Sequence, residues 1–302
     1  MDFRPITGAT RLVALLGDPV AHSLSPAIHN HAFARMGLAF AYVPLPVKKS
    51  HVFAAVNALR ACGFLGANVT IPHKQTVLPY CDRISEISRR IGVVNTLYFE
   101  GTTLCGTTTD YEGFLQSLAW MEIDPRNEHV VILGNGGVSR TLAHALALNR
   151  RYQSLTLAGR NADRVALLAA EIAAGSGATL SAIGADDPHF AGTMSRCTLL
   201  VNGTSAGMHP AVDGVPLPLS LLHRNLAVLD TVYNPAETRL LSAAKAAGCR
   251  AQNGLRMLLF QGLASFALWT GRAVDPEIFD VAELERMVAG GVRATTVKDA
   301  PQ

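Results

Sequence analysis

The sequence predicts an α/β protein of two domains, each built around a mostly parallel sheet. Short β-rich runs alternate with helical patterns, a glycine-rich turn follows a buried strand near the middle of the chain, and 302 residues are enough for two separate cores. Hydrophobic residues make up 49% of the chain and charged residues 16%, so apolar burial is sufficient to exclude disorder as the main state.

Charge and hydropathy exclude two classes of partner. The net charge is only +3 and no run of basic residues is interleaved with aromatic residues, so we expect no nucleic-acid partner. The most apolar stretch, residues 255–269, contains Arg256 and Gln261 and is shorter than the roughly 18 to 20 residues of a membrane span, so we expect no membrane segment. Five scattered cysteines without a C-x-x-C pair indicate reduced thiols in the cytoplasm.

The first part of the chain, up to Asp110, shows the alternation that is typical of βαβ units. Residues 12–16 and 40–43 are β-rich, and residues 51–62 have a helical pattern with its apolar positions on one face. Residues 17–30 then contain a loop with Ser23 and, directly before Pro26, Ser25 as a natural N-cap. Two hydroxyl groups at such a helix start form a small anion site, although an ordinary capped helix is the alternative.

A second cycle of strands and helices begins near Glu128. Residues 129–133 predict a buried strand, residues 134–137 a glycine turn and residues 139–148 a helix, followed by a strand at 155–157 and a helix at 162–174. A βαβ unit opened by a glycine turn is typical of a Rossmann-like nucleotide-binding domain, in which backbone N–H groups meet a pyrophosphate. Arg140 stands where the motif usually has its last glycine, and an ordinary strand-to-helix connection is the alternative.

The end of the next predicted strand carries two arginines. Arg160 and Arg164 are four residues apart, so both guanidinium groups can reach one phosphate if the helix begins near Asn161. This favours NADP over NAD, because NADP carries a 2′-phosphate on its adenosine ribose. The alternative is a solvated helix start, with Asp163 paired to either arginine.

Three further segments each end in an amide, a hydroxyl or a charged group. Residues 66–74, 91–96 and 106–110 are short apolar or glycine-started runs, and polar groups at strand ends line the crevice where open α/β sheets bind ligands. The candidate binding residues are Asn68, Thr70, Lys74, Asn95 and Asp110. Near the C-terminus, residues 254–271 predict a buried helix, residues 276–288 one more helix, and residues 291–302 a polar tail.

The order of these motifs resembles that of the shikimate dehydrogenase family, from about Val13 to Trp269. The resemblance rests on residues 17–30, 66–74, 91–96, 106–110, 134–140, 201–208, 230–235 and 257–262. It implies a substrate-binding domain of residues 1–110 completed by 254–290, an NADP-binding domain of residues 111–253, and a C-terminal helix that returns to the first domain. It also implies NADP-dependent reduction of 3-dehydroshikimate to shikimate, a step of chorismate and aromatic amino acid biosynthesis.

The resemblance assigns roles residue by residue. Lys74 and Asp110 are similar to the catalytic pair, and Lys74 acts there as proton donor or as electrostatic clamp. The substrate contacts implied are Ser23, Ser25, Asn68, Thr70, Asn95, Tyr233 and Gln261. The cofactor contacts implied are Gly134, Asn135, Gly136, Gly137, Val138, Arg160, Asn161, Arg164, Thr204 and Met208.

The chain departs from the family pattern at two places. Thr108 stands where the family commonly has asparagine, and Gly159-Arg160-Asn161 stands where it commonly has Asn-Arg-Thr. Ser25 favours shikimate, because quinate-preferring relatives often change this serine. A quinate/shikimate dehydrogenase using NAD(P) and a non-catalytic ligand-binding relative are the alternatives. We expect no metal, because His29 and His31 diverge on a helix, and either a monomer or a homodimer.

Overall fold

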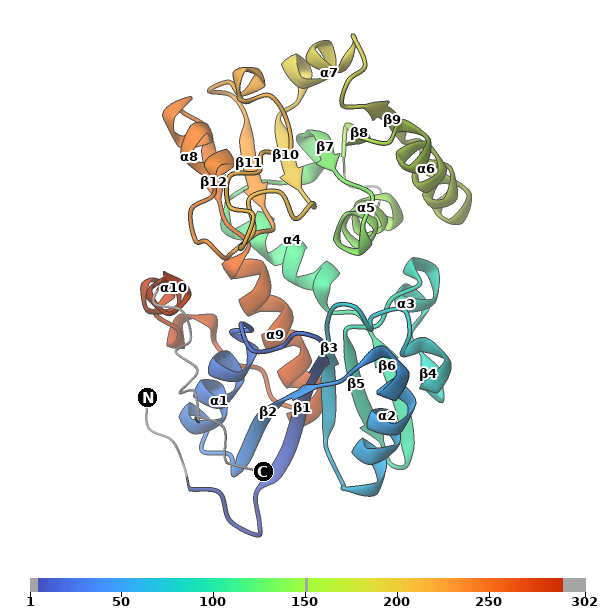
Figure 1. Ribbon diagram of the computed structural model, residues 1–302, viewed down its shortest axis with the longest axis vertical. Coiled ribbons are helices and arrows are strands. Elements are labelled where there is room, and N and C mark those ends of the chain that lie inside the picture. Colours follow the sequence, from blue (N-terminus) through green and yellow to red (C-terminus); the bar gives the residue numbers. More distant parts are fainter. Residues whose placement is uncertain (1–4, 150–151, 290–302) are drawn as a thin grey trace, which may run out of the picture.

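The computed structural model describes residues 5–149 and 152–289, which form two sheets with helices on both faces of each (Figure 1). The predicted tail at 291–302 lies outside the described residues. Among those that are described, no helix combines the length and the apolar character needed to cross a membrane.

The first sheet has six strands in the order β2-β1-β3-β5-β6-β4. Strand β1 pairs in parallel with β2 and β3, and β4 pairs in parallel with β6, whereas β5 runs antiparallel to both of its neighbours. The strands are β1 Arg11–Gly17, β2 Phe40–Pro46, β3 Gly66–Val69, β4 Arg83–Ile84, β5 Thr96–Glu100 and β6 Thr103–Thr107.

Side-chain alternation along β1 explains how helices cover both faces of this sheet. Val13 and Leu15 pack with one set of helices, and Ala14 and Leu16 face the opposite side. The first set is α1 Ser25–Arg35, α9 Leu255–Thr270 and α10 Val281–Ala289, and the opposite side is covered by α2 Val52–Ala61. A short helix, α3 Glu86–Ile91, precedes β5. The strands and the helix expected in this part are therefore confirmed.

The second sheet is fully parallel, in the order β12-β11-β10-β7-β8-β9. Its strands are β7 His129–Leu133, β8 Ser154–Gly159, β9 Ser181–Gly184, β10 Leu199–Asn202, β11 Ala227–Asp230 and β12 Arg250–Gln252. One face packs against α4 Asp110–Trp120, α5 Gly137–Asn149 and α6 Ala162–Ser176, and the other against α7 Phe190–Arg196 and α8 Arg239–Ala246. This is the doubly wound order of a Rossmann-like domain, with β7 at the switch point.

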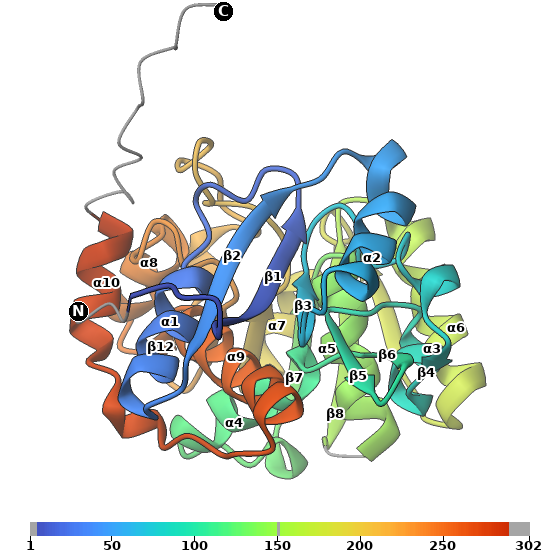
Figure 2. The ribbon, with the colours of Figure 1, turned by 90° about the horizontal axis from the view of Figure 1, so that it is seen from below.

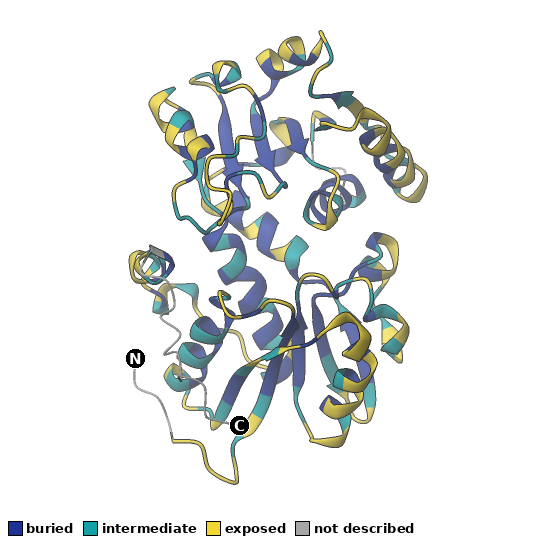
Figure 3. Cartoon of the chain, viewed as in Figure 1, coloured by how far each residue is buried: buried dark blue, intermediate teal, exposed yellow. Residues whose placement is uncertain are grey.

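Two helices connect the sheets. Helix α4 leads from the first sheet to the second, and α9 returns from the second and packs into the core of the first (Figures 1 and 2). The expected return of a C-terminal helix is confirmed, and α9 is buried along most of its length (Figure 3). Gly113 of α4 permits a close approach, since a Cβ atom there would lie 2.7 Å from the carbonyl oxygen of Met257.

The single helix expected at residues 276–288 is wrong. The chain forms a short 3-10 turn, Pro276–Ile278, and then α10. Phe279 between them is buried and packs against the ring of His31, with 5.2 Å between centroids. Asp280 accepts a hydrogen bond from the backbone N–H of Ala282, which starts the new helix.

Candidate active site

Polar residues from three separate segments lie together at the edge of the first sheet that is formed by the carboxyl ends of β3 and β6. Strand β5 begins at this edge, because it runs in the opposite direction. The register places Asn68 opposite Thr96, and Thr96 opposite Thr107. Asn95 therefore precedes a strand, and the expectation that residues 91–96 end a strand is wrong. Helix α3 ends at Ile91 and the chain turns there through Gly92, which has a φ of 75°.

Lys74 and Asp110 form an ion pair at this edge. The Nζ atom of Lys74 lies 2.6 Å from Oδ2 of Asp110, and their side chains are 25% and 14% exposed. Lys74 lies in the turn after β3, where its carbonyl oxygen accepts a hydrogen bond from Val94 N–H. Asp110 is the first residue of α4, so its carboxylate also lies at the positive end of a helix dipole. The pair remains partly accessible, which would allow a bound molecule to reach it.

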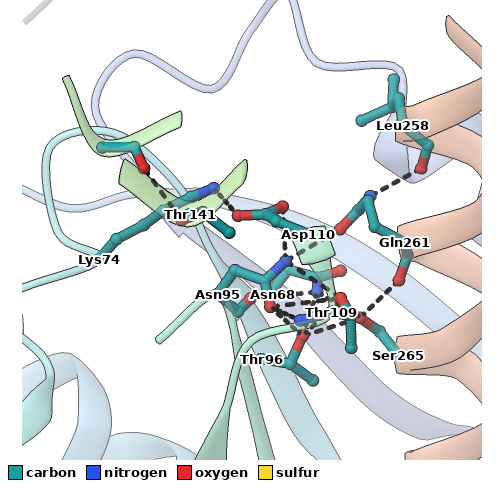
Figure 4. Close-up of polar contacts among 11 residues, drawn as sticks. Asn68, Lys74, Asn95, Thr96, Thr109, Asp110, Thr141, Leu258, Gln261 and Ser265 are labelled. Carbon is teal, nitrogen blue, oxygen red and sulfur yellow. Dashed lines mark hydrogen bonds and ion pairs between the residues drawn. The ribbon is translucent and has the colours of Figure 1, made fainter. Parts of the chain in front are cut away.

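Asn95 joins this pair to the returning helix. Its Nδ2 atom donates to Asp110 Oδ1 at 2.9 Å and lies 3.1 Å from Oε1 of Gln261 (Figure 4). The Nε2 group of Gln261 donates to the carbonyl oxygen of Leu258. The structure thus brings four predicted residues together, Lys74, Asp110, Asn95 and Gln261, although they come from distant parts of the sequence.

Asn68 lies one layer deeper than these four residues. It is only 5% exposed, its Nδ2 donates to Thr96 Oγ1 and Ser265 Oγ, and its Oδ1 accepts from the Tyr42 hydroxyl at 2.8 Å. The local motifs do not predict this buried hydroxyl layer, which comprises Tyr42, Thr96, Thr109 and Ser265. One signal was available, because Ser265 follows Gln261 by one turn on an otherwise apolar helix.

The two serines of the first loop lie at the start of α1. Ser25 does not cap the helix: Leu24 occupies the N-cap position, and Ser25 is the first helical residue. Ser23 Oγ instead accepts a hydrogen bond from the backbone N–H of Ser25, which closes a tight local turn. Thr70, directly after β3, is half-buried and donates its backbone N–H to the carbonyl oxygen of Leu16.

Tyr233 follows β11 and reaches from the second sheet to the first. It is half-buried against the core cluster that contains Val13 and Leu255. Burial raises the pKa of its phenol above the usual value, so the hydroxyl group is a proton donor at neutral pH. Its position adds a hydrogen-bonding group from the second sheet to the first.

The glycine turn after β7 has the backbone geometry of a phosphate cradle. Gly134 has a φ of 104°, and a Cβ atom there would lie 2.7 Å from Ser139 Oγ and 2.8 Å from Thr204 Cγ2. Ser139 Oγ donates to the carbonyl oxygens of Leu133 and Gly203, which holds the turn against the next strand. Open space lies beyond the Cα atoms of Gly136 and Gly137, and Asn135 beside them is exposed while Val138 is half-buried. The turn therefore fits a dinucleotide pyrophosphate.

The basic residues after β8 also fit a phosphate. Arg160 and Arg164 are exposed, and neither side chain has a hydrogen-bond or ion-pair partner in the described part of the chain. Asn161 caps α6 by accepting from the backbone N–H of Arg164 at 2.9 Å, so the helix begins where the two arginines can converge. Asp163 pairs with neither arginine within residues 5–149 and 152–289. Met208, in the loop after β10, is 42% exposed.

No group of three or more metal-ligand side chains is found among the described residues. The five cysteines are free thiols. His29 is fully buried and stacks on Tyr42 with 4.5 Å between ring centroids, and burial lowers its pKa to about 3.

Comparison with known families gives two matches. A model described as the shikimate dehydrogenase substrate binding domain matches residues 15–97, and one described as the shikimate 5′-dehydrogenase C-terminal domain matches residues 254–279. The chain is 43% identical over 285 residues to a protein of Moorella thermoacetica named shikimate dehydrogenase (NADP(+)). The aligned region covers 94% of this chain and 96% of that protein.

Solved structures agree with this similarity. Shikimate 5-dehydrogenase from Thermus thermophilus, in complex with NADP(H) and shikimate, matches with a TM-score of 0.81 and 34% identity, over 92% of this chain and 99% of that one. Quinate dehydrogenase from Corynebacterium glutamicum, in complex with NAD, matches with a TM-score of 0.82 and 31% identity, over 89% of this chain and 96% of that one.

Proposed function

Because this chain belongs to the shikimate dehydrogenase family, we propose that it catalyses the reversible NADP-dependent reduction of 3-dehydroshikimate to shikimate. The observation that carries the proposal is the ion pair of Lys74 and Asp110, 2.6 Å apart, beside the amides of Asn95 and Gln261. This arrangement offers a proton source and neutral hydrogen-bonding groups for the hydroxyls of a small ring. The reaction is a step of chorismate and aromatic amino acid biosynthesis.

Lys74 supplies the proton of the reaction. Reduction of a ketone adds a hydride to the carbonyl carbon and a proton to its oxygen, and bound NADPH provides the hydride. The Lys74 ammonium stabilises the negative charge that develops on the oxygen and then gives it the proton. Asp110 holds the ammonium in place through Oδ2, while its Oδ1 is held by Asn95. In the opposite direction a neutral Lys74 takes the proton from the hydroxyl of shikimate.

The remaining predicted residues divide between substrate and cofactor. We assign Ser23, Ser25 and Tyr233 to the substrate carboxylate, and Asn68, Thr70, Asn95 and Gln261 to the side of the ring hydroxyls. Asn68 acts there largely by positioning its neighbours, because its amide is occupied within the protein. The cofactor contacts are Gly134, Asn135, Gly136, Gly137, Val138, Arg160, Asn161, Arg164, Thr204 and Met208.

The exposed guanidinium groups of Arg160 and Arg164 favour NADP. Neither has a partner within residues 5–149 and 152–289, so both can bind the 2′-phosphate in a charge-assisted manner. Asn161 contributes chiefly as the helix cap that sets the spacing of the arginines, since its side-chain oxygen accepts from Arg164 N–H.

We propose a substrate domain of residues 1–110 completed by 254–290, and an NADP-binding domain of residues 111–253. Support comes from Phe114 and Leu118 of α4, which pack into the core of the second sheet, and from Leu255 and Leu259 of α9, which pack into the core of the first.

All assigned site residues belong to one chain, so either a monomer or a homodimer can be active. The free thiols favour a reducing compartment such as the cytoplasm.

Quinate oxidation is the second candidate, since a quinate dehydrogenase has the same fold at 31% identity. Steady-state absorbance of NAD(P)H distinguishes the two, with shikimate and quinate each tested against NADP and NAD. We expect the highest kcat/KM for shikimate with NADP. A higher kcat/KM for quinate with NAD reverses the assignment, and no turnover of any pair leaves a non-catalytic binding protein.

A further inference from the structure

Ser265 joins the returning helix α9 to three other segments of the site. Its Oγ atom lies 3.0 Å from Asn68 Nδ2 in β3, 2.8 Å from Thr96 Oγ1 in β5, and 3.1 Å from Thr109 Oγ1 directly before α4. It also donates to the carbonyl oxygen of Gln261 at 3.0 Å. These contacts are drawn in Figure 4, and Ser265 is fully buried, so it does not itself meet a ligand.

The bonding capacity of a hydroxyl group limits how these neighbours can be arranged. Ser265 Oγ has one proton and two lone pairs, whereas Asn68 Nδ2 can only donate and the Gln261 carbonyl can only accept. Ser265 therefore accepts from Asn68 and donates its one proton to the Gln261 carbonyl, which leaves its second lone pair for a hydroxyl proton of Thr96 or Thr109. Removal of this hydroxyl group takes one hydrogen-bonding neighbour from Asn68, Thr96 and Thr109 at once, so the remaining bonds of this buried layer must rearrange.

These neighbours are the groups that orient Asn95. Asn95 Oδ1 accepts from Thr109 N–H at 2.8 Å and from Thr96 Oγ1 at 2.7 Å, and Asn95 Nδ2 lies 3.0 Å from Thr109 Oγ1. Asn95 in turn contacts Asp110 and Gln261. A path of hydrogen bonds therefore runs from Ser265 through two threonines to the amide beside the ion pair.

We infer that Ser265 is a positioning residue for substrate binding, which acts through Thr96 and Thr109 on Asn95. The inference rests on the proposed function, and it concerns the substrate side only. The glycine turn and the arginines assigned to NADP belong to the second sheet, whereas all partners of Ser265 belong to the first sheet, to α9 or to the residue before α4.

Ser265→Ala tests the inference, with Ser117→Ala as its matched control. Ser117 is equally buried on α4, but among the described residues its Oγ donates only to the carbonyl oxygen of Gly113 one turn earlier. We expect Ser265→Ala to raise KM for shikimate about ten-fold, which corresponds to the loss of one buried hydrogen bond, while KM for NADP stays within about two-fold. Ser117→Ala should leave both KM values unchanged, even if its melting temperature falls as much as that of Ser265→Ala.

Further variants keep the result clear. Ser265→Thr retains the hydroxyl group and should keep KM for shikimate near the wild-type value. Ser265→Cys keeps a similar volume with weak hydrogen bonding, and it should show the raised KM if the alanine variant does not fold. Equal KM for shikimate in folded variants of Ser265 and Ser117 overturns the role of Ser265. Wild-type protein that does not oxidise shikimate overturns the proposed function, and this inference with it.

Discussion

Gly113 and Gln261 meet backbone to backbone. A Cβ atom on Gly113 would lie 2.8 Å from the Cβ atom of Gln261 and 2.8 Å from its backbone nitrogen. The helix that begins with Asp110 therefore contacts the helix that carries the Gln261 amide at the level of the site itself. Any side chain at position 113 must change the separation of these two helices.

Gly113→Ala should therefore impair both stability and activity. The added methyl group forces α4 and α9 apart, at a typical overpacking cost of about 1 to 3 kcal/mol, and displaces Asp110 from Gln261. We expect a lower melting temperature and a fall in kcat/KM for shikimate of about ten-fold or more. Gly192→Ala in α7 is the control, because open space surrounds that position and alanine favours a helix. Unchanged kcat/KM in Gly113→Ala would show that helix separation does not matter.

Lys74→Ala should remove the proton donor. We expect kcat to fall by about 10² to 10⁴, the usual contribution of a general acid, while the Kd for NADP measured by calorimetry stays nearly the same. Lys49→Ala, an exposed lysine in the turn before α2, should behave as wild type. Wild-type turnover by Lys74→Ala would contradict the assigned chemistry.

Arg160→Ala and Arg164→Ala should separate NADP from NAD. Each variant loses charge-assisted hydrogen bonds to the 2′-phosphate, and we expect KM for NADP to rise roughly ten- to one-hundred-fold. KM for NAD should change little, because NAD has no phosphate at that position. Arg196→Ala, exposed at the end of α7, serves as control. A similar rise for both cofactors would place the arginines elsewhere than at the 2′-phosphate.

Acid should destabilise the protein through buried histidines. Burial lowers the pKa of His29 from 6.5 to about 3 and that of His144 to about 4. Below pH 6.5 the two histidines bind protons in the unfolded chain but not in the folded protein. Their contribution to the free energy of unfolding is therefore fully present above pH 6.5 and is lost as the pH falls towards their folded-state pKa values.

Urea unfolding of His29→Phe measures this effect. Between pH 7 and pH 5 the wild-type free energy of unfolding should fall by about 2 kcal/mol more than that of the variant, since one histidine has been removed. Phenylalanine keeps the ring stacked on Tyr42, and His51→Asn at an exposed position is the control. Parallel pH curves for wild type and His29→Phe would rule out a contribution from this ring.

The hydrophobic pattern of a segment predicted its helix or strand correctly where the segment's own periodicity decides which side chains are buried. Residues 129–133 form β7 over the predicted range. The helical pattern at 51–62 forms α2, and its apolar positions Val52, Val56 and Leu59 are buried together. The same patterns gave a wrong prediction where contacts with neighbouring residues decide where a helix begins or ends. Ser25 and the predicted helix at 276–288 each obey a local rule, but Leu24 takes the cap position and the burial of Phe279 interrupts the helix.

Chemistry-bearing residues were identified by their motifs, and their family resemblance assigned their roles. The deeper layer was not identified, because hydroxyl groups such as those of Thr109 and Ser265 are common in any sequence. What distinguishes them is mutual contact across residues that are 156 positions apart in the chain.

The sequence by itself determined two α/β domains, a glycine turn with two following arginines, and the residue types of the site that we propose for proton transfer, because these depend on periodicity and short spacing. The tertiary structure alone decided which groups meet. The reversed direction of β5 places Asn95 beside Asp110, and the return of α9 adds Gln261 and Ser265 to the same edge. Strand direction and helix return arise from long-range packing, which no local pattern encodes.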